Sequence, residues 1–442
     1  MSVSSDGSHR PTGFGPTRGW GAPLGRRSVL RGVAGIAAAG AFTAACGSNT
    51  GRGSSGDGST PALHQWYHQY GEAGVEQAVK RYAKAYTKAD VEVTWVPGDY
   101  DTKLATALLG SNGPDVFEQA VAKVDQVKAG QLVDLSDQIA GAKDDFVTAT
   151  LDSQTVDGKI YGIPQSIDMQ LMFYRKSLLS AAGVTPPSTI DELVDAAKKL
   201  TTKKVKGLFL GNDGGASVLG ATPLWSVGLS FLSDDQRKVG FDDPAAATVL
   251  GKLRTLYTSG SLLLGAPADW SDPSAFTQGL TAMQWSGLWA IPTVQQALGS
   301  DFGVIAWPKG SASGALSVPI GAFASTVSAK SPHVSAAKDF AKWLWVDQTA
   351  DQLDFDQSYG FHIPARKSLA AKATKLKTGA AADAVKLVQD YGKVQSTPGW
   401  TAKMGTAFSD AMNNIIRKGT NPESALRGAI STVNAELATL YK

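Results

Sequence analysis

The strongest constraint on the fold of this chain is an alternation of strand-like and helix-like segments. Residues 63–67 predict a first strand, and apolar side chains three and four apart over 72–87 predict an amphipathic helix. The alternating segment 91–96 predicts a second strand, 100–109 a second helix, and 114–117 a third strand. Strand, helix, strand, helix, strand is the order of a wound α/β sheet.

The same alternation continues through the chain, and no repeat of constant length is visible. Ser188 or Thr189 is placed to cap a helix whose first turn contains two acidic residues. A chain of 442 residues is too long for one ordinary core, so two lobes are expected. Further strands are predicted at 160–164, 170–174, 208–210, 301–307 and 321–327, and further helices at 189–200 and 334–345.

The N-terminus has the features of an export signal. Arg26 and Arg27 precede an apolar run of 14 residues, 32–45. That run is shorter than the roughly 20 residues that span a bilayer, but it suits the apolar region of a signal peptide. The arginine pair resembles a twin-arginine signal, and it also fits the basic start of a general secretory signal.

Cys46 is the only cysteine, which excludes an intramolecular disulfide. It follows Ala44 and Ala45 and resembles a lipoprotein processing site, from which Thr43 departs because leucine is usual there. The alternative is a buried helix with an incidental cysteine. We expect residues 1–45 to be a signal peptide, Cys46 to be lipidated, and the Gly/Ser-rich stretch 46–61 to be a flexible tether.

The charge of the chain argues against nucleic acid as a partner. The net charge of +3 depends on the N-terminus, where residues 1–45 contain five arginines and one aspartate. The remainder has 37 basic and 38 acidic side chains. A nearly neutral body lacks the basic surface of a nucleic-acid-binding protein.

Several motifs, taken in order, resemble the family 1 extracellular solute-binding proteins, the maltose-binding type that serves ABC importers. The resemblance covers nearly all of residues 62–442. It rests on the strand and helix from Leu63 and on the segments at 113–117 (GPDVF), 129–135 (AGQLVDL), 157–164 (DGKIYGIP), 173–176 (FYRK), 282–289 (AMQWSGLW), 302–304 (FGV), 331–344 and 360–366 (GFHIPAR).

The resemblance implies an α/β, two-lobed periplasmic-binding-protein-like fold with a hinged cleft between the lobes. Lobe 1 would hold 62–164 and 319–377, and lobe 2 would hold 165–318 and 378–442. It further implies a monomeric, non-enzymatic protein without cofactor or metal. Such a protein binds a small carbohydrate outside the cell, is anchored to the membrane through Cys46, and delivers its ligand to ABC importer permease subunits.

Sugars are recognised by flat aromatic rings and by hydrogen-bonding side chains. Trp289 is the main aromatic candidate, because it follows an expected turn at 286–287 where the family places a stacking ring. Trp285 is a second candidate or a core residue. Trp225 and Trp400 are candidate platforms in the second lobe.

The polar candidates follow predicted strands. Gln69 and Tyr70 come after the first strand, and Glu118 and Gln119 come after the third, where the family directs polar or aromatic groups at the ligand. Asp168 matches an acidic position of the family after the first lobe crossing, and a hinge hydrogen bond is the alternative.

Three further polar candidates for ligand binding also have structural explanations. Asn212 and Asp213 end a strand in the second lobe, where ligands of wound sheets collect, but an ordinary turn explains them nearly as well. Arg366 could bind hydroxyl groups, although we favour an ion pair in the first lobe.

Other chemistries find little support. No Gly-x-Ser-x-Gly or phosphate-binding loop is present. His64 and His68 lie in and just after a predicted strand, where a spacing of four does not converge on a metal. A glycosidase would need two carboxylates across one bond, and the sequence neither shows nor excludes them. A non-sugar solute, such as a polyamine, peptide, metal complex or phosphorylated compound, remains the alternative within the same fold.

Overall fold

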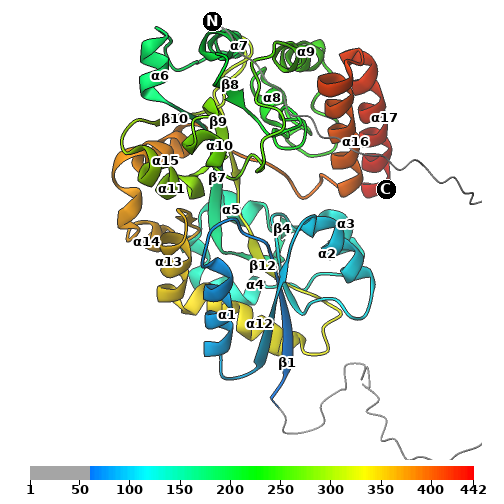
Figure 1. Ribbon diagram of the computed structural model, residues 1–442. Coiled ribbons are helices and arrows are strands. Elements are labelled where there is room, and N and C mark those ends of the chain that lie inside the picture. Colours follow the sequence, from blue (N-terminus) through cyan, green and yellow to red (C-terminus); the bar gives the residue numbers. More distant parts are fainter. Residues whose placement is uncertain (1–59) are drawn as a thin grey trace, which may run out of the picture. The chain divides into compact units, whose positions relative to one another are not determined.

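The computed structural model describes residues 60–442, which form two main sheets with helices packed around them (Figure 1). The predicted signal peptide, Cys46 and nearly all of the tether lie outside these residues. The first sheet has the order β2-β1-β3-β12-β6, with β1 parallel to β2 and β3, and β12 antiparallel to β3 and β6. Its strands are β1 (Ala62–His68), β2 (Asp90–Val96), β3 (Val116–Gln119), β6 (Gly162–Pro164) and β12 (Ala324–Val327).

Helices α1 (Val75–Ala85) and α12 (Val334–Lys342) bury their apolar faces against this sheet. Leu63, Val79 and Phe340 belong to one buried cluster, called the first core. The neighbouring elements are α2 (Tyr100–Leu109), α3 (Val124–Lys128), α4 (Ser136–Ile139), α5 (Thr148–Asp152), α13 (Thr349–Ser358), α14 (Lys367–Ala370) and the hairpin β4 (Thr155–Val156) and β5 (Lys159–Ile160).

The second sheet is built around the nine-residue strand β7 (Ser166–Tyr174). Strands β9, β10, β11 and β13 all pair with β7 in antiparallel fashion, while β8 and β14 extend the sheet in parallel from β9 and β11. The bounds are β8 (Lys206–Phe209), β9 (Thr281–Gly287), β10 (Gly303–Ile305), β11 (Val318–Gly321), β13 (Ile363–Pro364) and β14 (Gly392–Val394).

Two clusters of buried side chains hold the second sheet and its helices. The second core contains Leu193, Trp285 and Phe408, and the third core contains Phe173 and Ala381. The helices are α6 (Lys176–Ala181), α7 (Ile190–Leu200), α8 (Thr222–Trp225), α9 (Pro244–Thr258), α10 (Ser274–Thr277), α11 (Ile291–Leu298), α15 (Gly379–Tyr391), α16 (Ala402–Asn413) and α17 (Pro422–Leu440).

Local sequence signals explain several of these boundaries. The predicted cap of α7 is confirmed: Thr189 Oγ1 accepts the N–H of Glu192, and the Glu192 carboxylate accepts the N–H of Thr189. The expected turn at 286–287 is wrong, because these residues end strand β9. Ser286 and Gly287 pair with β7, and this pairing extends the strand through residues that, read locally, look like a turn.

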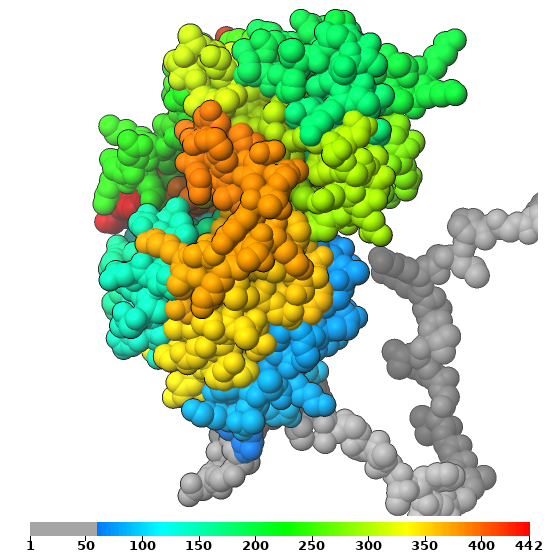
Figure 2. Space-filling view, turned by 90° about the vertical axis from the view of Figure 1, so that its left-hand side faces the viewer, coloured from blue at the N-terminus to red at the C-terminus, as the bar shows by residue number. Residues whose placement is uncertain are grey.

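The chain passes from one sheet to the other at three places. It leaves β6 of the first sheet at Pro164 and enters β7 at Ser166, and it returns between β11 and β12. The third passage is spread over 361–376, where side chains of the first and third cores interleave. Figure 2 shows this part of the chain, in orange, at the surface between the yellow and yellow-green segments. The exact lobe boundaries stay a prediction.

Within residues 60–442, no helix combines the length and apolar character that crossing a bilayer requires.

Candidate functional site

A buried carboxylate, Glu118, organises the carboxyl ends of β1 and β3. These strands are parallel neighbours, so the residues that follow them meet at one edge of the sheet. Glu118 is 1% exposed. Its Oε1 accepts the Tyr70 hydroxyl at 2.6 Å, and its Oε2 accepts the His68 backbone N–H at 3.1 Å and lies 2.8 Å from His68 Nδ1. These bonds offset the cost of burying a charge.

Aromatic rings surround that carboxylate. The His68 ring lies between Tyr70 and Phe323, with centroid distances of 3.9 Å and 4.2 Å. Tyr100 donates its hydroxyl to the Glu118 carbonyl at 2.8 Å. Burial and the negative charge of Glu118 raise the pKa of Tyr70 well above its usual value. Tyr70 is therefore a neutral phenol whose position is fixed by its hydrogen bond.

A cavity of about 320 Å³ opens beside this group. Its volume is suited to a small ligand, because pockets for small molecules occupy about 300–1,000 Å³. Aromatic, amide and carboxylate groups all reach its wall. The lining residues are His68, Gln69, Gly98, Asp99, Tyr100, Asp101 and Phe323.

A second polar group surrounds His362, whose side chain is nearly fully buried. His362 Nδ1 contacts Asp168 Oδ1, and Nε2 lies 3.2 Å from Glu72 Oε1. Burial alone disfavours the imidazolium, but Asp168 and Glu72 outweigh burial and raise the pKa of His362 well above its usual value. We therefore treat His362 as a cation shared by two carboxylates.

A further acid, Asp356, lies near this cation and is 0% exposed. Neither of its carboxyl oxygens makes a hydrogen bond within residues 60–442. Burial raises the pKa of Asp356 well above its usual value, although the charge of His362 opposes the shift. Burial therefore favours the protonated form of Asp356.

Two tryptophans form a partly exposed aromatic group beside the second sheet. Trp289 follows β9 and donates its indole N–H to the Ser271 carbonyl at 3.0 Å. Its ring meets Trp270 edge to face, with centroids 5.8 Å apart. The Trp289 ring also covers Gly287, where an added Cβ would lie 2.0 Å from the ring atom Cζ3. Only glycine at 287 leaves room for this ring position.

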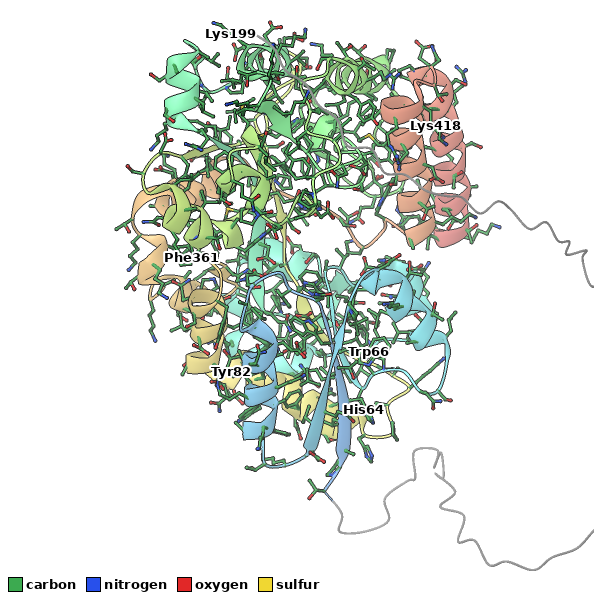
Figure 3. The ribbon with its side chains drawn as sticks, in the orientation of Figure 1. His64, Trp66, Tyr82, Lys199, Phe361 and Lys418 are labelled. Carbon is green, nitrogen blue, oxygen red and sulfur yellow. The ribbon has the colours of Figure 1, made fainter. Side chains whose placement is uncertain are left out.

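The tryptophan group adjoins the His362 group at Gly360. A Cβ at Gly360 would lie 2.9 Å from Glu72 Cγ and 3.3 Å from Trp289 Cβ. Side chains that follow β1 and β9 therefore come together at this glycine. Phe361, the next residue, is labelled in Figure 3 and packs against the third core.

Five predicted site residues thus belong to one region. Tyr70 and Glu118 are bonded to each other, Gln69 lines the cavity, and Asp168 and Trp289 join them through His362 and Gly360. Gln119 follows Glu118 and is 5% exposed, with an amide nitrogen that has no partner within residues 60–442.

The other predicted tryptophans are surrounded by protein. Trp285 is 0% exposed, donates to Gln170 Oε1 at 3.0 Å and packs against Trp307. Trp400 stacks on Phe231 with centroids 4.1 Å apart. Trp225 is also buried. None of the three has an open face in this conformation, and ligand contact by them stays a prediction.

The remaining polar candidates are bonded to other groups of the protein. Asn212 bonds to the backbone of Gly265 and Ala266. Asp213 accepts backbone N–H groups from its own turn. Arg366 Nε donates to Asp145 Oδ2 at 2.8 Å, which is the ion pair favoured from the sequence.

Sequence reasoning missed several residues of this region. His68 adjoins Gln69 but was considered only as a metal ligand, and no group of side chains in 60–442 is arranged to hold a metal ion. Phe323, Glu72, Trp270 and His362 gave no local signal, because their partners lie far along the chain.

Residues 77–391 match the family model of bacterial extracellular solute-binding proteins. The chain belongs to this family. One relative is a galactooligosaccharide-binding protein of Bacillus subtilis, 23% identical over 89% of this chain and 94% of that protein. Another is a diacetylchitobiose binding protein of Streptomyces coelicolor, 26% identical over 86% and 88%.

Solved structures confirm the predicted two-lobed fold of the solute-binding family. A solute-binding protein of Thermotoga lettingae, solved with α-D-tagatose, has a TM-score of 0.73 and 20% identity over 85% of this chain and 100% of that one. A substrate-binding protein of Listeria monocytogenes, solved with cycloalternan, has a TM-score of 0.72 and 22% identity over 86% and 100%.

Proposed function

We propose that this protein is the substrate-binding component of an ABC importer and that it binds a small carbohydrate between its lobes. The observation that carries the proposal is the single region in which Tyr70, Glu118, Asp168 and Trp289 come together. Rings can stack on the C–H faces of a sugar, while carboxylates accept its hydroxyl groups. The relatives with sugar names support the same assignment.

Within this proposal the aromatic and polar groups have different roles. Trp289 supplies a stacking face, Asp168 accepts hydrogen bonds, and Gln69 accepts or donates them. Glu118 fixes the Tyr70 hydroxyl and holds His68 at the cavity wall. Gln119 can donate its unpartnered amide N–H. The protein breaks no bond, so it needs neither a catalytic residue nor a cofactor, and importer subunits would supply the energy of transport.

A thermal-shift screen of residues 47–442 tests the proposal. This segment contains both sheets and all three cores. A ligand that binds only the folded state raises the melting temperature. We expect a saturable shift with one or more mono- or oligosaccharides, followed by calorimetry that shows binding and chromatography that recovers the sugar intact.

Other outcomes of the screen would reject the proposal in different ways. A shift with a polyamine or amino acid alone would keep the fold and replace the ligand. A shift accompanied by sugar cleavage would make the protein an enzyme.

We also propose that the protein is exported and held at the membrane by a lipid on Cys46. The small residues before this cysteine support the proposal, and one relative is named a solute-binding lipoprotein. Labelled palmitate should be incorporated into the wild-type chain but not into Cys46→Ser. Labelling of the variant would place the lipid elsewhere, and no labelling of either chain would refute lipidation.

A further inference from the structure

The pairing of β13 with β7 places His362 opposite Asp168. Ile363 is the partner of Ile167, and Pro364 is the partner of Ser166, in an antiparallel register. Continued by one residue, that register sets 362 against 168. The contact between the two side chains is therefore a consequence of strand pairing, rather than of chance proximity.

The main chain around His362 is also held in place. Its N–H donates to the Asp356 carbonyl at 3.0 Å, and the Gln357 amide donates to its carbonyl at 3.3 Å. The imidazole stacks on Phe355, with centroids 5.8 Å apart, and meets Tyr70 edge to face at 6.4 Å. His362 thus touches both a charged and an aromatic member of the candidate site.

His362 is the only cation paired with these carboxylates in the described part of the chain. The ion pairs of residues 60–442 include no lysine or arginine bound to Glu72 or Asp168. Asp168 uses only Oδ1 for the imidazole, its Oδ2 makes no hydrogen bond within the same residues, and its side chain is 19% exposed. One oxygen of Asp168 is fixed by the protein and the other remains available to a ligand.

We propose that His362 is a positioning residue of the sugar site, and that it holds the Asp168 carboxylate in the orientation that the ligand requires. This inference rests on the proposed function. His362 itself is buried beneath these groups and makes no contact with the sugar. Its effect on affinity passes through Asp168.

The pH dependence of binding follows from the charges around the imidazole. The groups that face it are Glu72 from the segment after β1, Asp168 from β7, Asp356 from α13 and Tyr70. The two carboxylates that contact His362 keep its pKa above the usual value of about 6.5. The ion pair between the His362 imidazolium and Asp168 is therefore fully formed below about pH 6.5. It is lost as the pH rises through the higher pKa that His362 has in the folded protein.

The test is calorimetry with D-tagatose, mannobiose and diacetylchitobiose on the purified mature protein, using whichever of the three binds the wild type. We expect Asp168→Asn and His362→Asn each to weaken binding about tenfold or more, because a hydrogen bond to a charged group is lost. The double variant should bind no more weakly than Asp168→Asn alone. His64→Asn, which changes an exposed histidine of β1, is the matched control and should bind as the wild type.

A second readout separates positioning from mere stabilisation. The ¹⁵N resonances of His362 should titrate above pH 6.5, and affinity should fall over the same range. Glu72→Gln removes one of the two carboxylates, so it should lower the midpoint of both curves while binding at pH 6 persists. This variant keeps the inference testable if His362→Asn does not fold.

Three results would overturn the inference. His362→Asn could melt earlier yet bind with unchanged affinity, its effect could add fully to that of Asp168→Asn, or affinity could be independent of pH while the imidazole titrates. If the wild type binds none of these three sugars, the same measurements are made with a sugar found in the thermal-shift screen. If it binds no sugar in that screen, the proposed function fails and the inference falls with it.

Discussion

Single residues of the candidate site differ in how far local sequence could reveal them. Gln69, Tyr70 and Glu118 were predictable, because Gln69 and Tyr70 follow β1, Glu118 lies at the end of β3, and parallel strands end at one edge. His362 was not predictable, because its role depends on a register with β7, almost two hundred positions earlier. Trp285 and Trp289 look alike in sequence, and only the packing shows which ring is enclosed.

The first residue-scale prediction separates these two tryptophans. Trp289→Ala should weaken sugar binding at least tenfold and leave the melting temperature nearly unchanged, because its ring is only partly buried. Trp285→Ala should instead cost about 3–5 kcal/mol of unfolding free energy, as expected for a large ring removed from a core. Calorimetry and denaturant unfolding measure the two effects. Unchanged affinity in Trp289→Ala would assign that ring to structure alone.

The second prediction concerns the glycine beneath that ring. Gly287→Ala should displace Trp289, because the new methyl group would occupy the position of the indole. We expect weaker sugar binding and reduced quenching of tryptophan fluorescence by the ligand. Gly428→Ala on α17 meets nothing within 4 Å and serves as the control. Equal affinities in the two variants would show that the ring can move without consequence.

At the scale of elements, the helices and strands with regular patterns were predicted well. The bounds of α2 agree at both ends, and α7 begins directly after its predicted cap. The wrong prediction at the end of β9 has a physical reason: a Ser-Gly pair indicates a turn locally, but pairing with the long strand β7 makes it part of a strand. Local patterns therefore identify elements better than they identify which elements become central to a sheet.

The third prediction tests the cap of α7. Thr189→Ala removes the side-chain acceptor for the Glu192 N–H and should lower the unfolding free energy by about 1 kcal/mol. Thr432→Ala, within α17, removes only a bond to the carbonyl of the preceding turn and should be close to neutral. Chemical denaturation with unchanged m-values measures both. Equal unfolding free energies of Thr189→Ala and the wild type would show that the cap of α7 contributes nothing to stability.

Across the whole molecule, ion pairs connect segments that are distant in sequence. Arg366 binds Asp145 beside the first core, and Arg175 binds Asp301 beside the second sheet. Partial burial raises the pKa of Asp301, but bonds from Ser177 and Arg175 outweigh burial and lower it overall. At Asp145, too, burial raises the pKa, but hydrogen bonds from Ser368 and Arg366 outweigh burial and lower it overall.

The fourth prediction follows from these lowered values. A carboxylate whose pKa is depressed by folding contributes stability above about pH 3.9, and that contribution disappears as the pH falls through the folded value. Asp301→Asn should therefore lower the melting temperature at pH 7 and converge with the wild type near pH 2. A constant difference between the two proteins across that range would contradict the assignment.

The order of strands in the first sheet also has a consequence for how the protein is made. Strand β12 lies between β3 and β6, although it is synthesised long after both. A nascent chain that has already released β6 cannot complete this sheet until residues 324–327 emerge. Unpaired strand edges then stay exposed while the intervening segment is translated, and such edges bind chaperones or aggregate. The interleaved topology thus delays folding until most of the polypeptide exists.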